Sequence, residues 1–184
     1  MRRLFEYGGV AAGVILIALG IGATTIGALG VNEVRDNLAR EQIVGTPDST
    51  IPGQKVDTGA EAKAFADVMR KHTLESTEGQ VYSQMGRYLD ENGQATNDEA
   101  AAAKDPKTGQ PVANQARNIW VTETALTSAL NMAFFAERVA FFSIAMGIAL
   151  LLSGIGFVVL TFAGAVRRPE KAVEAWAKRP VPTT

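Results

Sequence analysis

The sequence contains no cysteine and only one histidine. Without cysteine, the chain can form no disulfide, thiolate nucleophile or cysteine-based metal site. A catalytic zinc site usually takes two or more histidines, so His72 with the nearby Glu75 is a weak metal candidate and more often a packed or partly exposed residue. No serine lies in a G-x-S-x-G sequence, and no segment follows the phosphate-binding pattern G-x-x-x-x-G-K-S/T. We therefore expect no catalytic activity, no metal and no other cofactor.

Two long stretches also lack charge: residues 8–31 and 139–166 contain no Asp, Glu, Lys, Arg or His. Each exceeds the roughly 20 apolar residues that a helix needs to cross a bilayer. A proton relay or ion pathway usually contains ionisable residues within the membrane, so a pump or transporter is disfavoured. The sequence therefore predicts two transmembrane helices.

The first stretch has a second interpretation, because Arg2 and Arg3 precede it as they would in a signal peptide. Ala28-Leu29-Gly30 offers small residues at a spacing typical of cleavage. However, the apolar core of a signal peptide usually has only about 7–15 residues, and this stretch is longer. We expect it to be retained as a membrane span, with cleavage as the alternative.

Small residues recur at helical spacing in both stretches. Small side chains let two backbones approach closely in lipid, where hydrophobicity does not drive helices together. We predict a helix-packing face, against the other span or another subunit; the alternative is that glycine is simply frequent in membrane helices. The predicted packing residues are Gly9, Gly13, Gly20, Ala23, Gly27, Gly30, Gly147 and Gly154.

The middle of the chain, residues 32–138, is polar, with more acidic than basic residues. An acidic excess disfavours nucleic-acid binding, which needs clustered cations. Val34 and Leu38 keep helical spacing, so the first helix should continue beyond the apolar stretch, before a loop over residues 46–57. Thr58 and Glu61 match a capping box, which predicts a helix that runs to about Glu75.

The next segment also has helical spacing, at Val81, Met85 and Tyr88, and Asn92-Gly93 predicts a turn. Asn97 can cap a short helix over residues 98–104. Residues 90–99 are rich in side-chain oxygens but lack the order of a calcium-binding EF-hand loop, so a solvated turn is the better interpretation. From Ala113 the pattern is helical without a break, so one long helix should enter the second apolar stretch.

A set of apolar and aromatic residues in the middle has two interpretations. It could form an ordinary core, which we favour, or line a ligand pocket that signals through the long helix into the second span. The set comprises Phe65, Met69, Tyr82, Met85 and Tyr88. After the second span, Val173 and Trp176 could belong to a helix on the membrane surface, with a disordered basic tail as the alternative.

Two segments resemble a group of small two-span membrane proteins from actinobacteria. They are FADVMRKHTLESTEGQVYSQMGRYLDENG and AAAKDPKTGQPVANQARNIWVTETALTSALN. The resemblance covers residues from about Lys55 to the end of the second span and implies an extracytoplasmic domain between two helices. The family supplies no established activity or functional residues. Some members carry the label "aromatic ring-opening dioxygenase", which one histidine argues against, because such enzymes bind iron with several His and carboxylate ligands.

The positive charges of the termini indicate the orientation. Arg2, Arg3, Arg167, Arg168 and Lys171 flank the two spans, and positive flanks normally stay cytoplasmic. We expect an all-α protein of the cell membrane, with both termini cytoplasmic and a mostly helical extracytoplasmic domain. Its regions are the tail 1–7, the span 8–31, the domain 32–138, the span 139–166 and the basic tail 167–184.

The predicted function is a structural, accessory or oligomeric membrane component rather than an enzyme. We expect the partners to be the lipid bilayer and either a second copy or another membrane protein, with no nucleic acid. The alternative function is an extracytoplasmic ligand-binding or sensing domain coupled to the second span.

Overall fold

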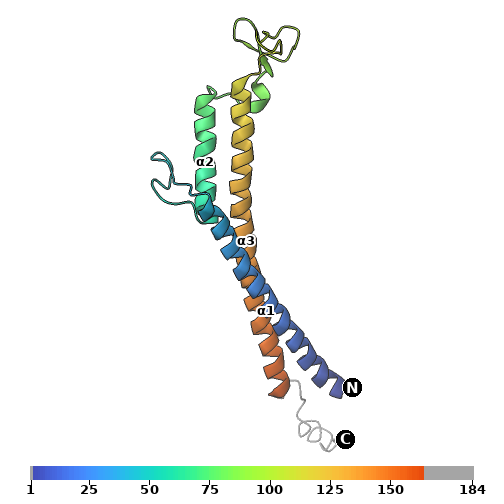
Figure 1. Ribbon diagram of the computed structural model, residues 1–184. Helices are drawn as coiled ribbons and strands as arrows, with labels where there is room; N and C mark the ends of the chain where they lie inside the picture. The colour runs from blue at the N-terminus through green and yellow to red at the C-terminus, as the bar shows by residue number, and fades with distance from the viewer. Residues whose placement is uncertain (1, 164–184) are drawn as a thin grey trace, which may run out of the picture. The chain divides into compact units, whose positions relative to one another are not determined.

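The computed structural model describes residues 2–163, and this part of the chain is mostly helical (Figure 1). Two long helices, α1 (Arg2–Arg40) and α3 (Gln115–Phe162), are each long and apolar enough to cross a membrane. Between them lie the helix α2 (Gly59–Ser76), a 3-10 turn over Tyr82–Gln84, and the strands β1 (Tyr88–Leu89) and β2 (Ala95–Thr96). The predicted pair of apolar helices is therefore present.

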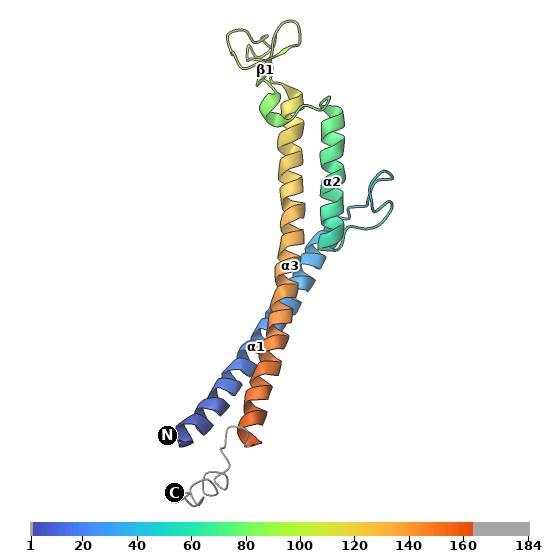
Figure 2. The same ribbon diagram turned by 180° about the vertical axis from the view of Figure 1, so that it is seen from behind.

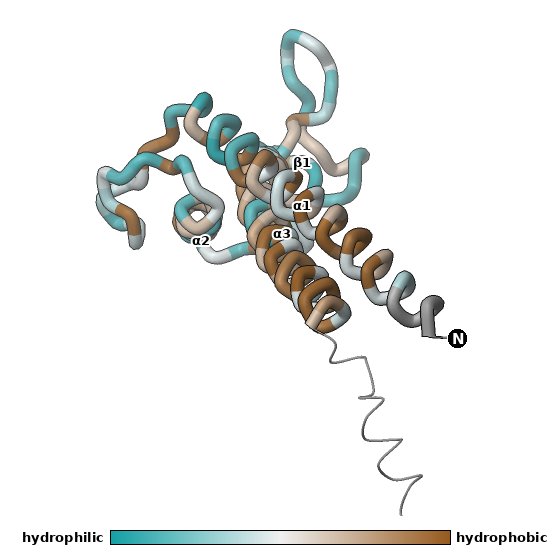
Figure 3. Tube along the Cα trace, turned by 90° about the horizontal axis from the view of Figure 1, so that it is seen from below, coloured by the Kyte–Doolittle hydropathy of each residue, from teal (hydrophilic) through white to brown (hydrophobic). Residues whose placement is uncertain are grey.

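The chain divides into two compact units. The first unit, called the helix pair, joins α1 up to Gly30 with α3 from Val139 onward. The second unit, called the middle unit, comprises Val31–Arg138. Apolar residues dominate both helices of the pair, as the brown segments of α1 and α3 show (Figure 3).

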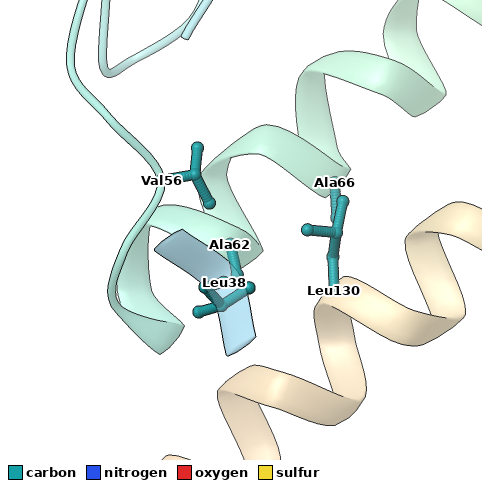
Figure 4. Close-up of a cluster of buried hydrophobic side chains, with 5 residues drawn as sticks. All are labelled: Leu38, Val56, Ala62, Ala66 and Leu130. Atoms are coloured by element: carbon teal, nitrogen blue, oxygen red, sulfur yellow. The ribbon is translucent and has the colours of Figure 1, made fainter. Parts of the chain in front are cut away.

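Within the middle unit, α2 runs antiparallel to α3. The N-terminal Gly59 of α2 lies against Phe134 and Glu137, whereas Thr77, just after α2, accepts a hydrogen bond from the indole of Trp120. A small core of buried apolar side chains joins the end of α1, the loop before α2, α2 itself and α3 (Figure 4). This core consists of Leu38, Val56, Ala62, Ala66 and Leu130. Alanines on α2 let the helices approach closely, which explains how so few large side chains form a core.

The start of α2 has the predicted capping box. The Thr58 hydroxyl accepts a hydrogen bond from the backbone N–H of Glu61, and the Glu61 carboxylate accepts one from the backbone N–H of Thr58 at 2.9 Å. Partial burial disfavours the charged form of Glu61. The hydrogen bonds that its carboxylate accepts from the backbone N–H groups of Asp57 and Thr58 have the larger combined effect, so the pKa of Glu61 is lowered. Two otherwise unpaired N–H groups at the helix start are thereby satisfied.

The loop between α1 and α2 folds back on itself. Gln42 adopts a positive φ of 53° directly after α1, and Val44 pairs with Lys55 in an antiparallel bridge. A side chain at Gly45 would collide with the backbone oxygen of Ile51, so only glycine fits at this crossing. The buried Val56 then leads the chain into α2.

The helical spacing at Val81, Met85 and Tyr88 corresponds only to the 3-10 turn over Tyr82–Gln84, and the predicted helix over 98–104 is wrong, so the fold of the described residues is not purely α. Tyr88–Leu89 pairs antiparallel with Ala95–Thr96, and Gly93 in the predicted turn has a positive φ of 77°. Figure 2 shows β1 among the loops that precede α3. The backbone N–H of Ala103 donates to the carbonyl of Leu89, and Asp90 pairs with Ala102 in an isolated antiparallel bridge, so the second segment lies beside β1. The predictions for Val173, Trp176 and the basic tail 167–184 lie outside the described residues.

Candidate functional site

The structure brings all eight predicted packing residues to the contact between α1 and α3 in the helix pair. A Cβ added at Gly20 would stand 2.7 Å from the carbonyl oxygen of Gly147, and one at Gly154 would stand 2.7 Å from that of Gly13. The same test at Gly27 meets the Ala140 carbonyl oxygen at 2.7 Å. Real Cβ atoms do not approach heavy atoms below about 3.0 Å, so these positions admit only glycine without a shift of the helices.

The other members of the predicted set lie along the same contact. Gly9 faces the Thr161 hydroxyl, Gly30 faces Ala140, and the carbonyl of Ala23 accepts a hydrogen bond of 2.9 Å from the Ser143 hydroxyl. By contrast, Gly8, Gly22 and Gly156 have nothing within 4 Å of an added Cβ. These three glycines lie off the contact and provide natural controls for the residues on it.

A groove lies in the middle unit. Its volume is about 680 Å³, and most of its lining is apolar. The last turns of α1 supply Val34 and Leu38, α2 supplies Phe65 and Met69, and α3 supplies Leu126 and Leu130. The polar groups of the lining are Asn37, in the last turn of α1, and Glu41, the residue directly after α1. This size falls in the usual range for small-molecule sites, and the lining suits an apolar ligand.

Glu137 joins the three helices of the middle unit. One carboxylate oxygen accepts a hydrogen bond of 3.0 Å from Arg35 on α1, and the other accepts one of 3.2 Å from the backbone N–H of Gly59 at the start of α2. The Glu137 side chain is 6% exposed, whereas that of Arg35 is 46% exposed. A negative charge at a helix N-terminus is favourable, because the unpaired N–H groups there carry partial positive charge.

His72 lies in an exposed cluster with Asp48 and Lys71 rather than with Glu75. The Asp48 carboxylate accepts hydrogen bonds from Lys71 at 2.8 Å and shares one of 2.9 Å with His72 Nε2. The Lys71 ammonium and then His72 hold the pKa of Asp48 well below its usual range. Among the described residues, no group of three or more His, Asp or Glu side chains is placed to hold a metal ion. Through these contacts, Asp48 of the loop is joined to Lys71 and His72 of α2.

The apolar residues proposed as pocket or core do not form one site. Phe65 and Met69 line the groove, Tyr82 belongs to a separate hollow beside Trp120, and Met85 is buried. Sequence reasoning missed the contribution of Val34, Leu38, Leu126 and Leu130 to the groove. Their helical spacing was visible in the sequence, but their convergence depends on tertiary packing.

Comparison with protein-family models, with curated proteins and with solved structures finds no match for this chain.

Proposed function

We propose that this chain is a non-enzymatic protein of the cell membrane, in which the helix pair anchors the middle unit as a structural or accessory component. The observation that carries the proposal is the close backbone contact of two apolar helices at Gly13, Gly20 and Gly27. Small residues at a close crossing are the usual means by which helices associate in lipid.

The surface of the helix pair supports a lipid environment. Only 17% of the most apolar window of each long helix is buried, whereas a core helix of a soluble protein would be mostly buried. Large apolar side chains such as Ile26, Leu29 and Phe142 are more than half exposed. Such an apolar surface is costly in water and favourable among acyl chains.

The orientation rests on the charge of the flanking tails. Arg2, Arg3, Arg167 and Arg168 favour a cytoplasmic position of both termini, which directs the middle unit to the other side of the membrane. The middle unit is long, so its own charges have little influence on orientation.

The absence of cysteine permits a direct test of anchoring and orientation. Asp67→Cys on α2 should react with a membrane-impermeant maleimide in intact cells freed of their wall, and Thr183→Cys should react only after permeabilisation. The chain should also stay with the membrane in alkaline carbonate. Release by carbonate would contradict the membrane anchor, and labelling of Thr183→Cys without permeabilisation would contradict the orientation.

The groove favours a second candidate function, the binding of an apolar ligand by the middle unit. Its lining offers few hydrogen-bonding groups, so a ligand would be held mainly by its apolar surface. An apolar fluorescent probe, N-phenylnaphthylamine, should bind the purified protein, and Ala129→Trp, which fills part of the groove, should reduce that binding. Asp67→Trp, outside the lining, is the control. Equal probe binding by both variants would remove this candidate.

A further inference from the structure

The groove of the middle unit is amphipathic. Among the residues that the structure describes, Glu41 is the one ionisable residue of the lining, and Asn37 is the other polar one. The two are four residues apart at the end of α1, a spacing that places side chains on the same side of a helix. The remaining lining side chains are apolar, so the polar groups of the groove are gathered in one place.

The apolar part of the groove is elongated. On α3 the lining runs from Leu126 to Ala136, which corresponds to about 15 Å along the helix axis at about 1.5 Å per residue. Phe65 and Met69 of α2 line the same groove. An extended alkyl chain can bury its methylene groups one after another along such a surface, and each buried group adds to the affinity.

The charge of the lining favours a cationic head group on such a chain. Within the described part of the chain, no Lys, Arg or His side chain lines the groove, so an anionic head group would meet the Glu41 carboxylate without a compensating cation. A cationic head group would instead meet an opposite charge. Glu41 is exposed, so the head group can stay in contact with water while the alkyl chain is buried.

Arg40, the neighbour of Glu41 in the chain, does not line the groove. Its guanidinium donates hydrogen bonds to the backbone oxygen of Asp36, at 3.3 Å, and to the side-chain oxygen of Asn37. Both partners precede Arg40, so these bonds hold the guanidinium back along α1. The surroundings add to the preference for a cation, because residues 32–138 contain 16 acidic and 11 basic residues.

We propose that the groove binds a single-chain amphiphile with a positively charged head group, whose alkyl chain lies in the apolar part while its ammonium group lies beside Glu41. The proposal rests on the second candidate function, the binding of an apolar ligand, and names the class of that ligand. Burial of the alkyl chain supplies most of the affinity. The attraction to Glu41 supplies the choice among amphiphiles, since an exposed ion pair contributes little affinity of its own.

Displacement of a bound probe tests the preference in full-length protein held in a non-ionic amphipol, which brings neither lipid nor charge. N-Phenylnaphthylamine is bound first, and its fluorescence is followed as octylammonium, octanol or octanoate is added at pH 7 and low ionic strength. Octylammonium should displace the probe at a concentration about threefold to fivefold below that of octanol, the effect expected for one exposed ion pair. Octanoate should need a higher concentration than octanol, because like charges repel.

Three substitutions assign the preference to a residue. Glu41→Gln should remove the difference between octylammonium and octanol, and Glu41→Lys should make octanoate a better competitor than octylammonium. Glu33→Lys makes the same change of charge at an exposed residue of α1 outside the lining, and should keep the wild-type order. Glu41 is exposed, so the circular dichroism of its variants should match that of the wild type.

The outcomes separate the head-group preference from binding in the groove. An order that depends on Glu41 and not on Glu33 supports the cationic head group. Equal displacement by the three compounds, the wild-type order in Glu41→Gln, or reversal by Glu33→Lys contradicts it, while the groove remains a site for apolar ligands. Failure of the wild type to bind the probe would remove the groove as a ligand site, and the proposal with it.

Discussion

Gly20 on α1 and Gly147 on α3 lie so close together that neither position has space for a side chain. A Cβ on either residue would stand 2.7 Å from the carbonyl oxygen of the other, so the contact between α1 and α3 is backbone against backbone at this point. The relationship is reciprocal, which means that enlargement of either residue separates the helices. It also supplies a matched comparison, because Gly22 lies in the same helix with nothing within 4 Å of an added Cβ.

Gly20→Leu should destabilise the helix pair, whereas Gly22→Leu should have little effect. Insertion of side-chain atoms into a closely packed contact costs about 1–3 kcal/mol, and here the obstacle is backbone that cannot rotate away. The free energy of unfolding in mixed detergent micelles, followed by circular dichroism, measures the difference. Equal stabilities for the two variants would mean that the crossing does not depend on Gly20.

Glu137→Ala should destabilise the middle unit more than Glu137→Gln. Alanine leaves the buried N–H of Gly59 without an acceptor, which costs about 1–3 kcal/mol. Glutamine keeps one oxygen that can accept from Gly59 and loses mainly the charge that faces the half-exposed Arg35. Hydrogen exchange of the Gly59 amide measures the effect locally. If the two variants exchange at the same rate, the hydrogen bond to Gly59 contributes nothing measurable.

The loop before α2 should be held to α2 in a defined pH range. The Asp48 carboxylate has a lowered pKa in the folded protein, so its stabilising contribution is present above its ordinary pKa of about 3.9 and is lost as the pH falls through the folded pKa. Lys71, paired mainly with Asp48, has a raised pKa, so its contribution is present below about pH 10.4 and is lost at higher pH.

Hydrogen-exchange protection of the Gly45 and Gly53 amides, which bond within the loop, measures this dependence. Protection should be constant between about pH 5 and 9 and fall toward pH 3, relative to intrinsic exchange rates. Asp48→Asn, which removes the charge, should lower protection at pH 7 and reduce the change between pH 5 and 3, of which the part due to Glu61 remains. An unchanged pH profile in Asp48→Asn would show that Asp48 is not the titrating anchor.

The elements that the sequence predicted well are those whose signal is local. The two uncharged stretches predicted two long apolar helices, and the Thr58–Glu61 pattern predicted the start of α2. The continuous helical pattern from Ala113 predicted α3 to within two residues of its start at Gln115. In each case, the signal comes from residues that are close in the chain, either a run of apolar residues or a local hydrogen-bond pattern. These elements can therefore be predicted without knowledge of tertiary contacts.

The wrong predictions concern segments whose backbone groups pair with another segment instead of within one helix. Val81, Met85 and Tyr88 have helical spacing, yet Tyr88 pairs with Thr96 and Met85 is buried. The alanines after Asp98 favour a helix, but Ala103 donates its backbone N–H to Leu89 instead. Tertiary pairing here outweighs local preference, which amounts to only tenths of a kcal/mol per residue.

The groove and the burial of two acidic residues of α3 were equally hidden from the sequence. Leu126 could be assigned to a helix, but its place in a groove depends on where the end of α1 and α2 lie. Glu123 and Glu137 would ordinarily be assigned to an exposed face, whereas both are buried against the rest of the middle unit.

The contact of α1 with α3 through their small residues is the central claim, and a disulfide tests it most directly. A Cβ on Gly30 would lie 3.4 Å from the Cβ of Ala140, close to the Cβ separation of about 3.5–4.5 Å in disulfides. Oxidation of Gly30→Cys/Ala140→Cys in native membranes should give an intramolecular disulfide, and Leu29→Cys/Ala140→Cys should not, because the Leu29 side chain is exposed at 62%. Equal cross-linking of the two pairs, or none in the first, would contradict the packed helix pair.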